Sequence, residues 1–479
     1  MTTIAAAWRQ TDRTTVAVAA GLLLLALAVT EAALLAGPVY MMVAAAAVLA
    51  TIPAVWAISS PRRALPLYAF ALPLDIYLST ELRLTTTQVL QVGIVAAWAV
   101  RLLLTEGRPA GPRRRGSMGP TVRVGLALIV YLIVSLTWAI NPEVSARSVV
   151  RNLGAIMMAV YVAYHADRDL LGRITRAACY GALVTTVYGF AQYAQGGYDA
   201  LYPLFSPFYN EPFLSRGHGF AVVATFANPN ILAGYMLMVL PIGWASVVAA
   251  RGTRRAAWLV AVLMMGGVLL LTFSKGSWIL LGILAVAWFF ARLPGGGALM
   301  LAVAGGAALG VVLLFLDPIM NTLIALFPNS QEGSVDVRLS LWSAALSAFI
   351  ERPLLGFGLD GFAAATAGVR YGALADLVRA HNMYLQALVD LGVVGSVLWW
   401  TPCLLIVRRG LLQLRRADHG PEASLHLALL LGAAAYFLYG MVETLNISNQ
   451  YVNTSWLVIG LLAASNRLRA DELRRGSAA

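Results

Sequence analysis

Long apolar runs recur along almost the whole chain, and this feature constrains the fold more than any other. A helix of about 20 apolar residues crosses a lipid bilayer. Charged residues make up 12% of the 479 residues, about half of the share that is usual in soluble proteins. The sequence therefore predicts an all-α integral membrane protein, a single polytopic domain over residues 1–479 with about fourteen transmembrane helices. The apolar runs lie at roughly 14–36, 38–58, 64–79, 88–104, 121–139, 148–166, 174–194, 222–249, 256–273, 276–292, 298–316, 383–407, 424–445 and 452–466.

Basic residues in the short loops set the predicted orientation. If the spans alternate in direction, 25 of the 34 lysine and arginine residues fall on one face. Loops rich in these residues stay in the cytoplasm, so we expect both termini there, in a multi-pass protein of the cytoplasmic (inner) membrane. The first run continues through Gly37-Pro38 into the second without a polar segment, so we expect it to be retained rather than cleaved as a signal peptide. The formal charge of +12 is then largely a topology signal, and nucleic acid is not an expected partner.

The sequence predicts neither a disulfide framework nor a metal site. Cys179 and Cys403 both lie inside apolar runs, where a disulfide or a thiolate metal site is implausible. Asp167 and Asp169 have the spacing of a D-x-D motif, but Arg168 separates them and all three fall on the predicted cytoplasmic face. We interpret them as a solvated run of charges, and we expect no cofactor.

Two loops on the predicted outer face are long, at residues 195–221 and 317–382, and loops of that length often carry function. In the second loop, apolar residues recur at helical spacing and Pro353 would end the helix. These residues are Leu339, Trp342, Leu346, Phe349 and Ile350. We expect an amphipathic helix on the outer membrane surface, then a tight, flexible turn at 356–361. Residues 383–466 should form the final transmembrane helices.

Lys275 is the single lysine of the chain, and it lies where two predicted spans meet at the outer face. It is either an interfacial anchor or a fixed charge that points into a cavity.

His381-Asn382 opens the next predicted span and is followed by Gly392 and Gly395. At helical spacing His381 and both glycines share one face, and the glycines permit close helix packing. Asn382 could cap the helix beside an ordinary interfacial histidine. Alternatively, His381 acts as a general base or phosphate ligand, since imidazole exchanges a proton near neutral pH.

Several short motifs together resemble one known family. In chain order they are Asn228-Pro229-Asn230, Ser274-Lys275-Gly276, Arg338 in RLSLW, the segment 353–358 (PLLGFG), and His381-Asn382 followed by Gly392-x-x-Gly395. Over residues 222–396 the chain resembles the O-antigen ligase and polymerase superfamily.

The resemblance implies a metal-independent, inverting glycosyltransferase of the GT-C type. Such an enzyme moves a glycan from an undecaprenyl diphosphate carrier to an acceptor hydroxyl at the outer face of the cytoplasmic membrane. In that family two arginines engage the diphosphate and the motif histidine is essential. Arg338 and His381 match two of these positions. Lys275 stands where the family has its first arginine, which keeps the charge but loses the bidentate fork.

The chemistry of the reaction agrees with this assignment. A lipid diphosphate carries about two negative charges, so its transfer needs fixed cations and a base for the acceptor hydroxyl. Lys275, Arg338 and His381 meet this need, and Arg216 is a further diphosphate candidate unless it is a solvated loop residue. We expect supporting roles for Asn228, Asn230, Asn382, His218 and Asp75, of which Asp75 is the reserve base.

Two other interpretations stay open at this point. Many spans with membrane acids also fit a transporter, although carriers place their charges near the midplane of the bilayer. The motifs do not separate a ligase, which uses a lipid or surface glycan acceptor, from a polymerase, which uses a second carrier-linked repeat. In either enzyme the expected partners are the diphosphate-linked glycan donor, the acceptor and membrane lipids. Asp390 we interpret as structural.

Overall fold

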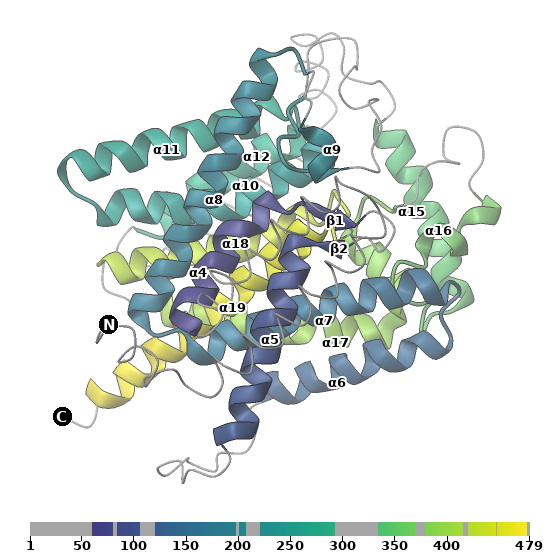
Figure 1. The fold of residues 1–479 in the computed structure, drawn as a ribbon. Helices are drawn as coiled ribbons and strands as arrows, with labels where there is room; N and C mark the ends of the chain where they lie inside the picture. Colours follow the sequence, from purple (N-terminus) through teal and green to yellow (C-terminus); the bar gives the residue numbers. More distant parts are fainter. Residues whose placement is uncertain are drawn as a thin grey trace, which may run out of the picture.

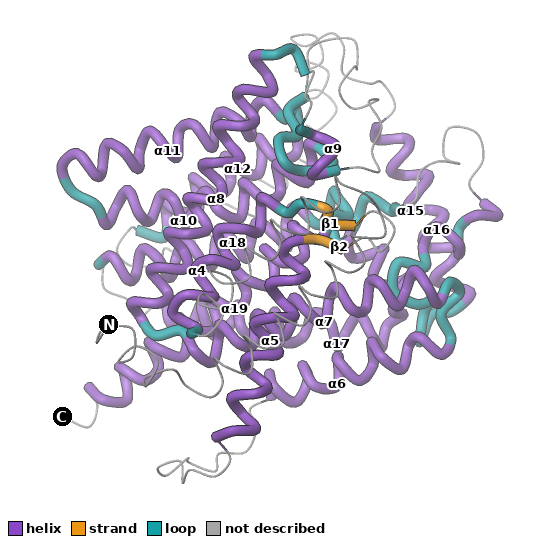
Figure 2. The backbone as a smooth tube through the Cα atoms, in the orientation of Figure 1, coloured by secondary structure: helices purple, strands orange, loops and turns teal. Residues whose placement is uncertain are grey.

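The computed structural model describes residues 60–79, 84–105, 120–197, 201–206, 221–292, 334–369, 379–414, 420–446 and 448–476. Helices make up most of these residues, as Figure 2 shows. The strands found there are β1 (Tyr77–Ser79) and β2 (Leu84–Thr85), which pair as one antiparallel hairpin. This architecture fits an all-α membrane protein.

Most predicted runs inside the described residues coincide with one helix. The long helices are α4 (Pro61–Ala71), α5 (Thr86–Thr105), α6 (Pro120–Val134), α7 (Pro142–His165), α8 (Arg168–Ala194), α10 (Pro229–Ala249), α11 (Gly252–Leu271), α12 (Lys275–Phe290), α15 (Ser334–Glu351), α17 (Met383–Leu414), α18 (Pro421–Tyr439) and α19 (Asn449–Gly476). The short ones are α9 (Tyr202–Phe205), α16 (Phe362–Ala365) and the 3₁₀ turns η1 (Leu72–Leu74), η2 (Ser135–Thr137) and η4 (Ala367–Val369).

Four of the described helices are long and apolar enough to cross a membrane: α10, α11, α17 and α18. The helix α12 and the stretch 121–137 are apolar but shorter. The chain is therefore a membrane protein by the character of its helices. The predicted runs at 14–36, 38–58 and 298–316 lie outside the described residues, and the count of fourteen spans stays a prediction.

The predicted span at 64–79 is wrong. The helix α4 ends at Ala71, and the chain then forms η1 and the strand β1. Pro73 lies within η1 and cannot donate a backbone hydrogen bond. The carboxylate of Asp75 then accepts a hydrogen bond from the backbone N–H of Thr87 (2.9 Å), which folds the chain back into the hairpin.

The helix α10 lies in the middle of the bundle (Figure 1), and most of its side chains are buried. It packs on α18 and α11, while α19 packs on α7. Glycines permit these close contacts: a Cβ on Gly432 would lie 2.8 Å from the carbonyl oxygen of Met238, and one on Gly460 would lie 2.7 Å from that of Ala159. Helices without side chains at such points approach closely in membranes.

A second, smaller core lies at one edge of the molecule, where α15 and α16 flank α17 (Figure 1). The helix α15 ends at Glu351, just before Pro353, as predicted. Leu339, Leu346 and Ile350, which belong to the apolar face predicted to lie on the membrane surface, are exposed. The placement of this face on the membrane stays a prediction. The residues of this core are Leu341, Ala345, Ala348, Phe357, Phe362, Ala380 and Val389.

Candidate active site

The carboxylate of Glu443 gathers three residues from distant parts of the chain. Its Oε1 accepts hydrogen bonds from Nη2 of Arg338 (2.9 Å) and from Nδ2 of Asn230 (2.8 Å). Its Oε2 lies 2.9 Å from Nδ1 of His381. The side chain of Glu443 is 5% exposed, whereas those of Arg338 and His381 are each 32% exposed. A buried acid thus holds two cationic or titratable groups at an accessible surface.

Local sequence places each partner of Glu443. Asn228 caps the N-terminus of α10, since its Oδ1 accepts a hydrogen bond from the backbone N–H of Asn230 (2.8 Å). Pro229 occupies the first helical position, where no backbone donor is needed. The cap fixes Asn230 in the first turn, so its amide reaches Glu443. Arg338 comes from the first part of α15.

His381 precedes α17 rather than belonging to it. Asn382 caps that helix, because its Oδ1 accepts hydrogen bonds from the backbone N–H groups of Tyr384 (2.9 Å) and Leu385 (3.0 Å). The helix begins at Met383, so the predicted helical face shared by His381 and the two motif glycines is wrong. His381 instead has a φ of 47°, in the left-handed region. Such residues are uncommon and cluster at functional sites.

Residues 440–444, which we call the 440–444 turn, hold the histidine segment in place. The backbone N–H of Asn382 donates to Oγ1 of Thr444 (3.0 Å), and its Nδ2 donates to the carbonyl of Met441 (3.0 Å). The backbone N–H of Met383 donates to the carbonyl of Gly440 (2.7 Å). These bonds fix the backbone on both sides of the contact between His381 and Glu443.

The contact between His381 and Glu443 selects one tautomer of the imidazole. An ionised carboxylate can only accept hydrogen bonds, so Nδ1 of His381 carries the proton. This assignment follows from the hydrogen-bond network. The lone pair is then on Nε2, the ring nitrogen that does not face Glu443. A base needs this arrangement.

Lys275 lies beside the 440–444 turn. Ser274 Oγ is 2.7 Å from the hydroxyl of Tyr439, and a Cβ on Gly276 would lie 3.6 Å from Cγ2 of Val442. Lys275 itself begins α12 and is half-buried. Within the described part of the chain, the side chain of Lys275 makes no hydrogen bond or ion pair. Its charge is therefore free of a carboxylate partner there, close to the turn that carries Glu443.

The glycine-rich segment 353–361 is hydrogen-bonded to α17. The backbone N–H groups of Phe357 and Gly358 donate to the carbonyls of Val389 (2.9 Å) and Asp390 (2.8 Å) in α17. Gly392 kinks α17 with a φ of 62°, and a Cβ there would lie 2.3 Å from the carbonyl oxygen of Leu354. Gly392 thus receives a loop and not a neighbouring helix. Gly395 permits the predicted close helix approach, since a Cβ there would lie 2.3 Å from Cε1 of Tyr131 in α6.

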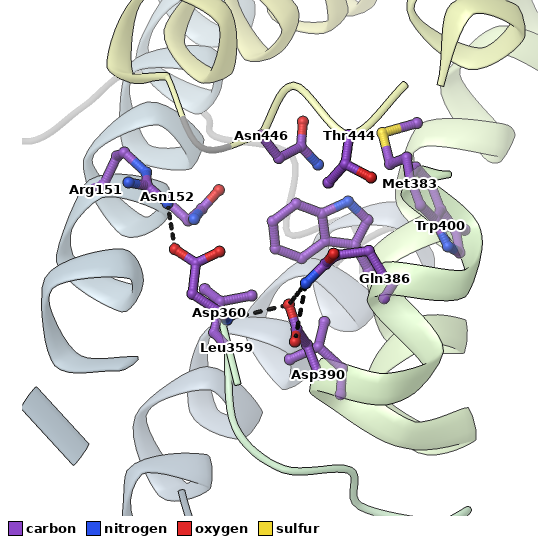
Figure 3. Close-up of a pocket in the computed structure, with 13 residues that line it drawn as sticks. Arg151, Asn152, Leu359, Asp360, Met383, Gln386, Asp390, Trp400, Thr444 and Asn446 are labelled. Carbon is purple, nitrogen blue, oxygen red and sulfur yellow. Dashed lines mark hydrogen bonds and ion pairs between the residues drawn. The ribbon is translucent and has the colours of Figure 1, made fainter. Parts of the chain in front are cut away.

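A second acidic cluster lies behind this segment, around a cavity of about 30 Å³ (Figure 3). Asp360 forms ion pairs with Arg151 (3.0 Å) and Arg379 (2.5 Å). Burial raises the pKa of Asp360, but the two arginines outweigh it and hold the pKa well below its usual range. Asp390 accepts hydrogen bonds from the backbone of Asp360 (3.1 Å) and Phe362 (3.0 Å). Its role is therefore the structural one that the sequence suggested.

Other predicted site residues lie elsewhere. Asp75 is buried, and its carboxylate accepts hydrogen bonds from Thr86, Thr87 and Asn449. The structure does not bring it to His381. Arg216 and His218 lie outside the described residues, and their roles stay predictions. Among the residues that the structure describes, no three His, Cys, Asp or Glu side chains form a group that could hold a metal ion.

Sequence reasoning missed Glu443, although a signal was present. The residue falls inside the predicted apolar run 424–445. An acid within such a run is a functional candidate by default, because an unpaired charge there is costly.

One comparison with known proteins found a match. No curated protein matches the chain. Residues 259–400 match the model of the family described as O-antigen ligase. This stretch contains Lys275, Arg338 and His381, while Asn230 and Glu443 lie on either side of it. The match agrees with the resemblance carried by the motifs, and over residues 259–400 it supports the O-antigen ligase superfamily.

Proposed function

We propose that this chain is an O-antigen ligase-like glycosyltransferase that moves a glycan from an undecaprenyl diphosphate carrier to an acceptor hydroxyl. The family indicates a membrane enzyme of glycan transfer in general. The observation that carries the more specific proposal is the contact of 2.9 Å between His381 Nδ1 and the buried carboxylate of Glu443. A carboxylate that orients an imidazole is the arrangement by which enzymes prepare a general base.

In the proposed reaction, Nε2 of His381 takes the proton of the acceptor hydroxyl. The acceptor oxygen forms a bond to the anomeric carbon of the donor sugar, and the bond from that carbon to the diphosphate oxygen breaks. The electron pair of that bond leaves with the carrier diphosphate. Attack from the side opposite to the leaving group inverts the anomeric configuration. The carboxylate of Glu443 stabilises the imidazolium that forms.

Cations near the base meet the charge of the diphosphate. Nη2 of Arg338 donates to Glu443, and the other guanidinium donors, which have no partner in the described part of the chain, are proposed to bind phosphate oxygens. Lys275 contributes a positive charge beside the same turn, and we propose Arg216 as a third contact. The leaving diphosphate gains negative charge as the sugar departs, so these cations favour the transition state over the ground state. We propose that no metal ion is required.

The proposed location is the outer face of the cytoplasmic membrane, with both termini in the cytoplasm. The excess of basic residues in the loops of the opposite face supports it. A polymerase that uses a second carrier-linked repeat as acceptor is the alternative within the same chemistry. A transporter is favoured less, because the gathered groups around Glu443 lie at helix ends rather than at the middle of helices.

A purified-component assay tests the proposal. Protein in nanodiscs, given a diphosphate-linked glycan and an acceptor, should release undecaprenyl diphosphate at an unchanged rate in the presence of a chelator. A lipid A core or surface glycan that serves as acceptor supports the ligase, and growth of carrier-linked repeats supports the polymerase. Strict dependence on a divalent metal contradicts the metal-independent mechanism. Solute uptake into vesicles without glycan transfer contradicts the enzyme assignment.

A further inference from the structure

A groove with four arginines lies between the N-terminal parts of α4 and α8. It has a volume of about 410 Å³. The arginines are Arg62, Arg63, Arg173 and Arg176, and its apolar wall includes Leu67 and Tyr180. None of these residues belongs to the proposed glycan-transfer site.

The groove and the Glu443 site lie at opposite ends of the bundle. The helix α8 has 27 residues and is therefore about 40 Å long. Near its C-terminal end, Oε1 of Gln192 accepts hydrogen bonds from the backbone N–H groups of Val223 (3.1 Å) and Ala224 (2.9 Å). These residues directly precede α10, whose first turn carries Asn230 of the site. The N-terminal end of α8, which lines the groove, thus lies on the other face.

The arginines of the groove differ in their partners. Arg62 is bonded to Asp167 and to Asp169 (3.1 Å), and Arg173 pairs with Asp169 (3.0 Å). Arg176 is exposed and makes no ion pair within the described ranges. Guanidinium groups bind phosphate oxygens with paired donors, so the groove favours a phosphate-bearing anion.

An apolar strip continues from the arginines along α8. Tyr180, Val184 and Val187 are 49%, 45% and 53% exposed, and their spacing places them on one face of the helix. The ring of Tyr180 stacks on Trp258 of α11, with the ring centroids 5.6 Å apart. This contact fixes the end of the strip that lies nearest to the arginines. An anionic lipid headgroup can bind to these cations while its acyl chains lie along the exposed apolar surface of the helix.

We propose that this groove binds one anionic phospholipid, with its phosphate among the arginines and an acyl chain along Tyr180, Val184 and Val187. A free phosphate would satisfy the arginines alone, whereas a phospholipid also covers the apolar strip. The proposal does not depend on glycan transfer, because it concerns the other end of the bundle.

Native mass spectrometry of the purified full chain tests this proposal. We expect phosphatidylglycerol to bind at least tenfold more tightly than phosphatidylcholine, and glycerophosphoglycerol, which has no acyl chains, to bind far more weakly. Arg176→Glu lowers the net charge of the groove by two units and should weaken phosphatidylglycerol binding roughly 30-fold.

Arg123→Glu is the matched control. Arg123 is an exposed arginine in the first turn of α6, a helix that packs on α17 and begins on the same predicted cytoplasmic face as α8. This variant should bind phosphatidylglycerol as the parent does, and both variants should elute and melt like the parent. Equal binding of the two phospholipids, or equal losses in both variants, overturns the proposal. Binding of glycerophosphoglycerol as tightly as the lipid overturns the assignment to a phospholipid.

Discussion

Glu443 and Asp360 are both acidic side chains that hold two basic partners, but the two clusters differ in access. The partners of Glu443 are each 32% exposed. The two arginines of Asp360 are 15% and 21% exposed, and Asp360 itself is 11% exposed. Similar chemical groups thus lie at a surface in one cluster and inside the protein in the other.

This difference in exposure distinguishes the candidate active site around Glu443 from the structural ion pairs around Asp360. Asp360 joins α7, through Arg151, to the segment that leads to His381, through Arg379. It also accepts a hydrogen bond from Ser148. Its carboxylate oxygens are thus used in contacts within the protein. In the Glu443 cluster, Nε2 of His381 and the remaining guanidinium donors of Arg338 have no partner among the residues that the structure describes. We therefore expect changes in the first cluster to affect stability and changes in the second to affect the reaction.

The largest expected effect is on the reaction. His381→Ala removes the proposed base and should lower the rate of glycan transfer by about 10²–10⁴-fold, the contribution typical of general acid–base catalysis. Donor binding should survive, because the cations remain. The measurement is the transfer rate at saturating donor together with the affinity for the carrier-linked glycan. A variant that transfers glycan at the parental rate would rule out His381 as the base.

Asp360→Asn should act on stability instead. It removes the carboxylate that pairs with two largely buried arginines, and removal of one partner from a buried ion pair costs about 3–5 kcal/mol of unfolding free energy. The rate per folded molecule should remain close to that of the parent. Thermal unfolding in detergent, followed by a transfer assay of the folded fraction, measures both quantities.

The same variant has a predicted pH signature. Because the folded-state pKa of Asp360 is lowered, its ion pairs stabilise the parent above the unfolded pKa, and this contribution is lost as the pH falls toward the folded pKa. The unfolding free energy of Asp360→Asn should therefore depend less on pH below about 4. Similar stability losses in both clusters would contradict the comparison between them.

The smallest expected effect concerns the kind of cation near the 440–444 turn. Lys275→Arg restores the residue of the related family and keeps the charge, so it should retain activity within a few-fold. Lys275→Ala should weaken both donor binding and the transfer rate, because the diphosphate is charged before and after the sugar leaves. Kinetics at varied donor concentration separate these effects. If Lys275→Ala behaves like the parent, the lysine is an interfacial anchor.

Much of the fold could be predicted from apolar run length alone. The runs at 256–273 and 276–292 agree with α11 and α12 within a few residues, because a uniformly apolar segment has few alternatives to a helix. The run at 64–79 failed, since hydropathy does not register Pro73 and Asp75, at which the chain turns. For α15 the helix was predicted, but its packing through Leu341, Ala345 and Ala348 was not, because those contacts depend on the tertiary fold.

The site could be predicted only in part. The motifs identified Arg338, Asn230 and His381, which the structure brings together, but a motif does not reveal what joins its residues. Glu443 lies 62 residues beyond His381, outside the motif region, and only the tertiary fold shows their contact. Asn382 illustrates the opposite case, because a helix cap is a local feature and its role could be proposed from the sequence.

A kinetic comparison of three variants tests most directly the claim that Glu443 prepares His381 as the base. The variants are His381→Ala, Glu443→Gln and the double substitution, each compared with the parent by its transfer rate at saturating donor. Glu443→Gln keeps the size of the side chain but removes the charge that selects the tautomer and stabilises the imidazolium. Residues that act as a unit have strongly non-additive effects. The account predicts that Glu443→Gln slows transfer and that the double variant is about as slow as His381→Ala. A parental rate in Glu443→Gln, or two losses that multiply in the double variant, would contradict it.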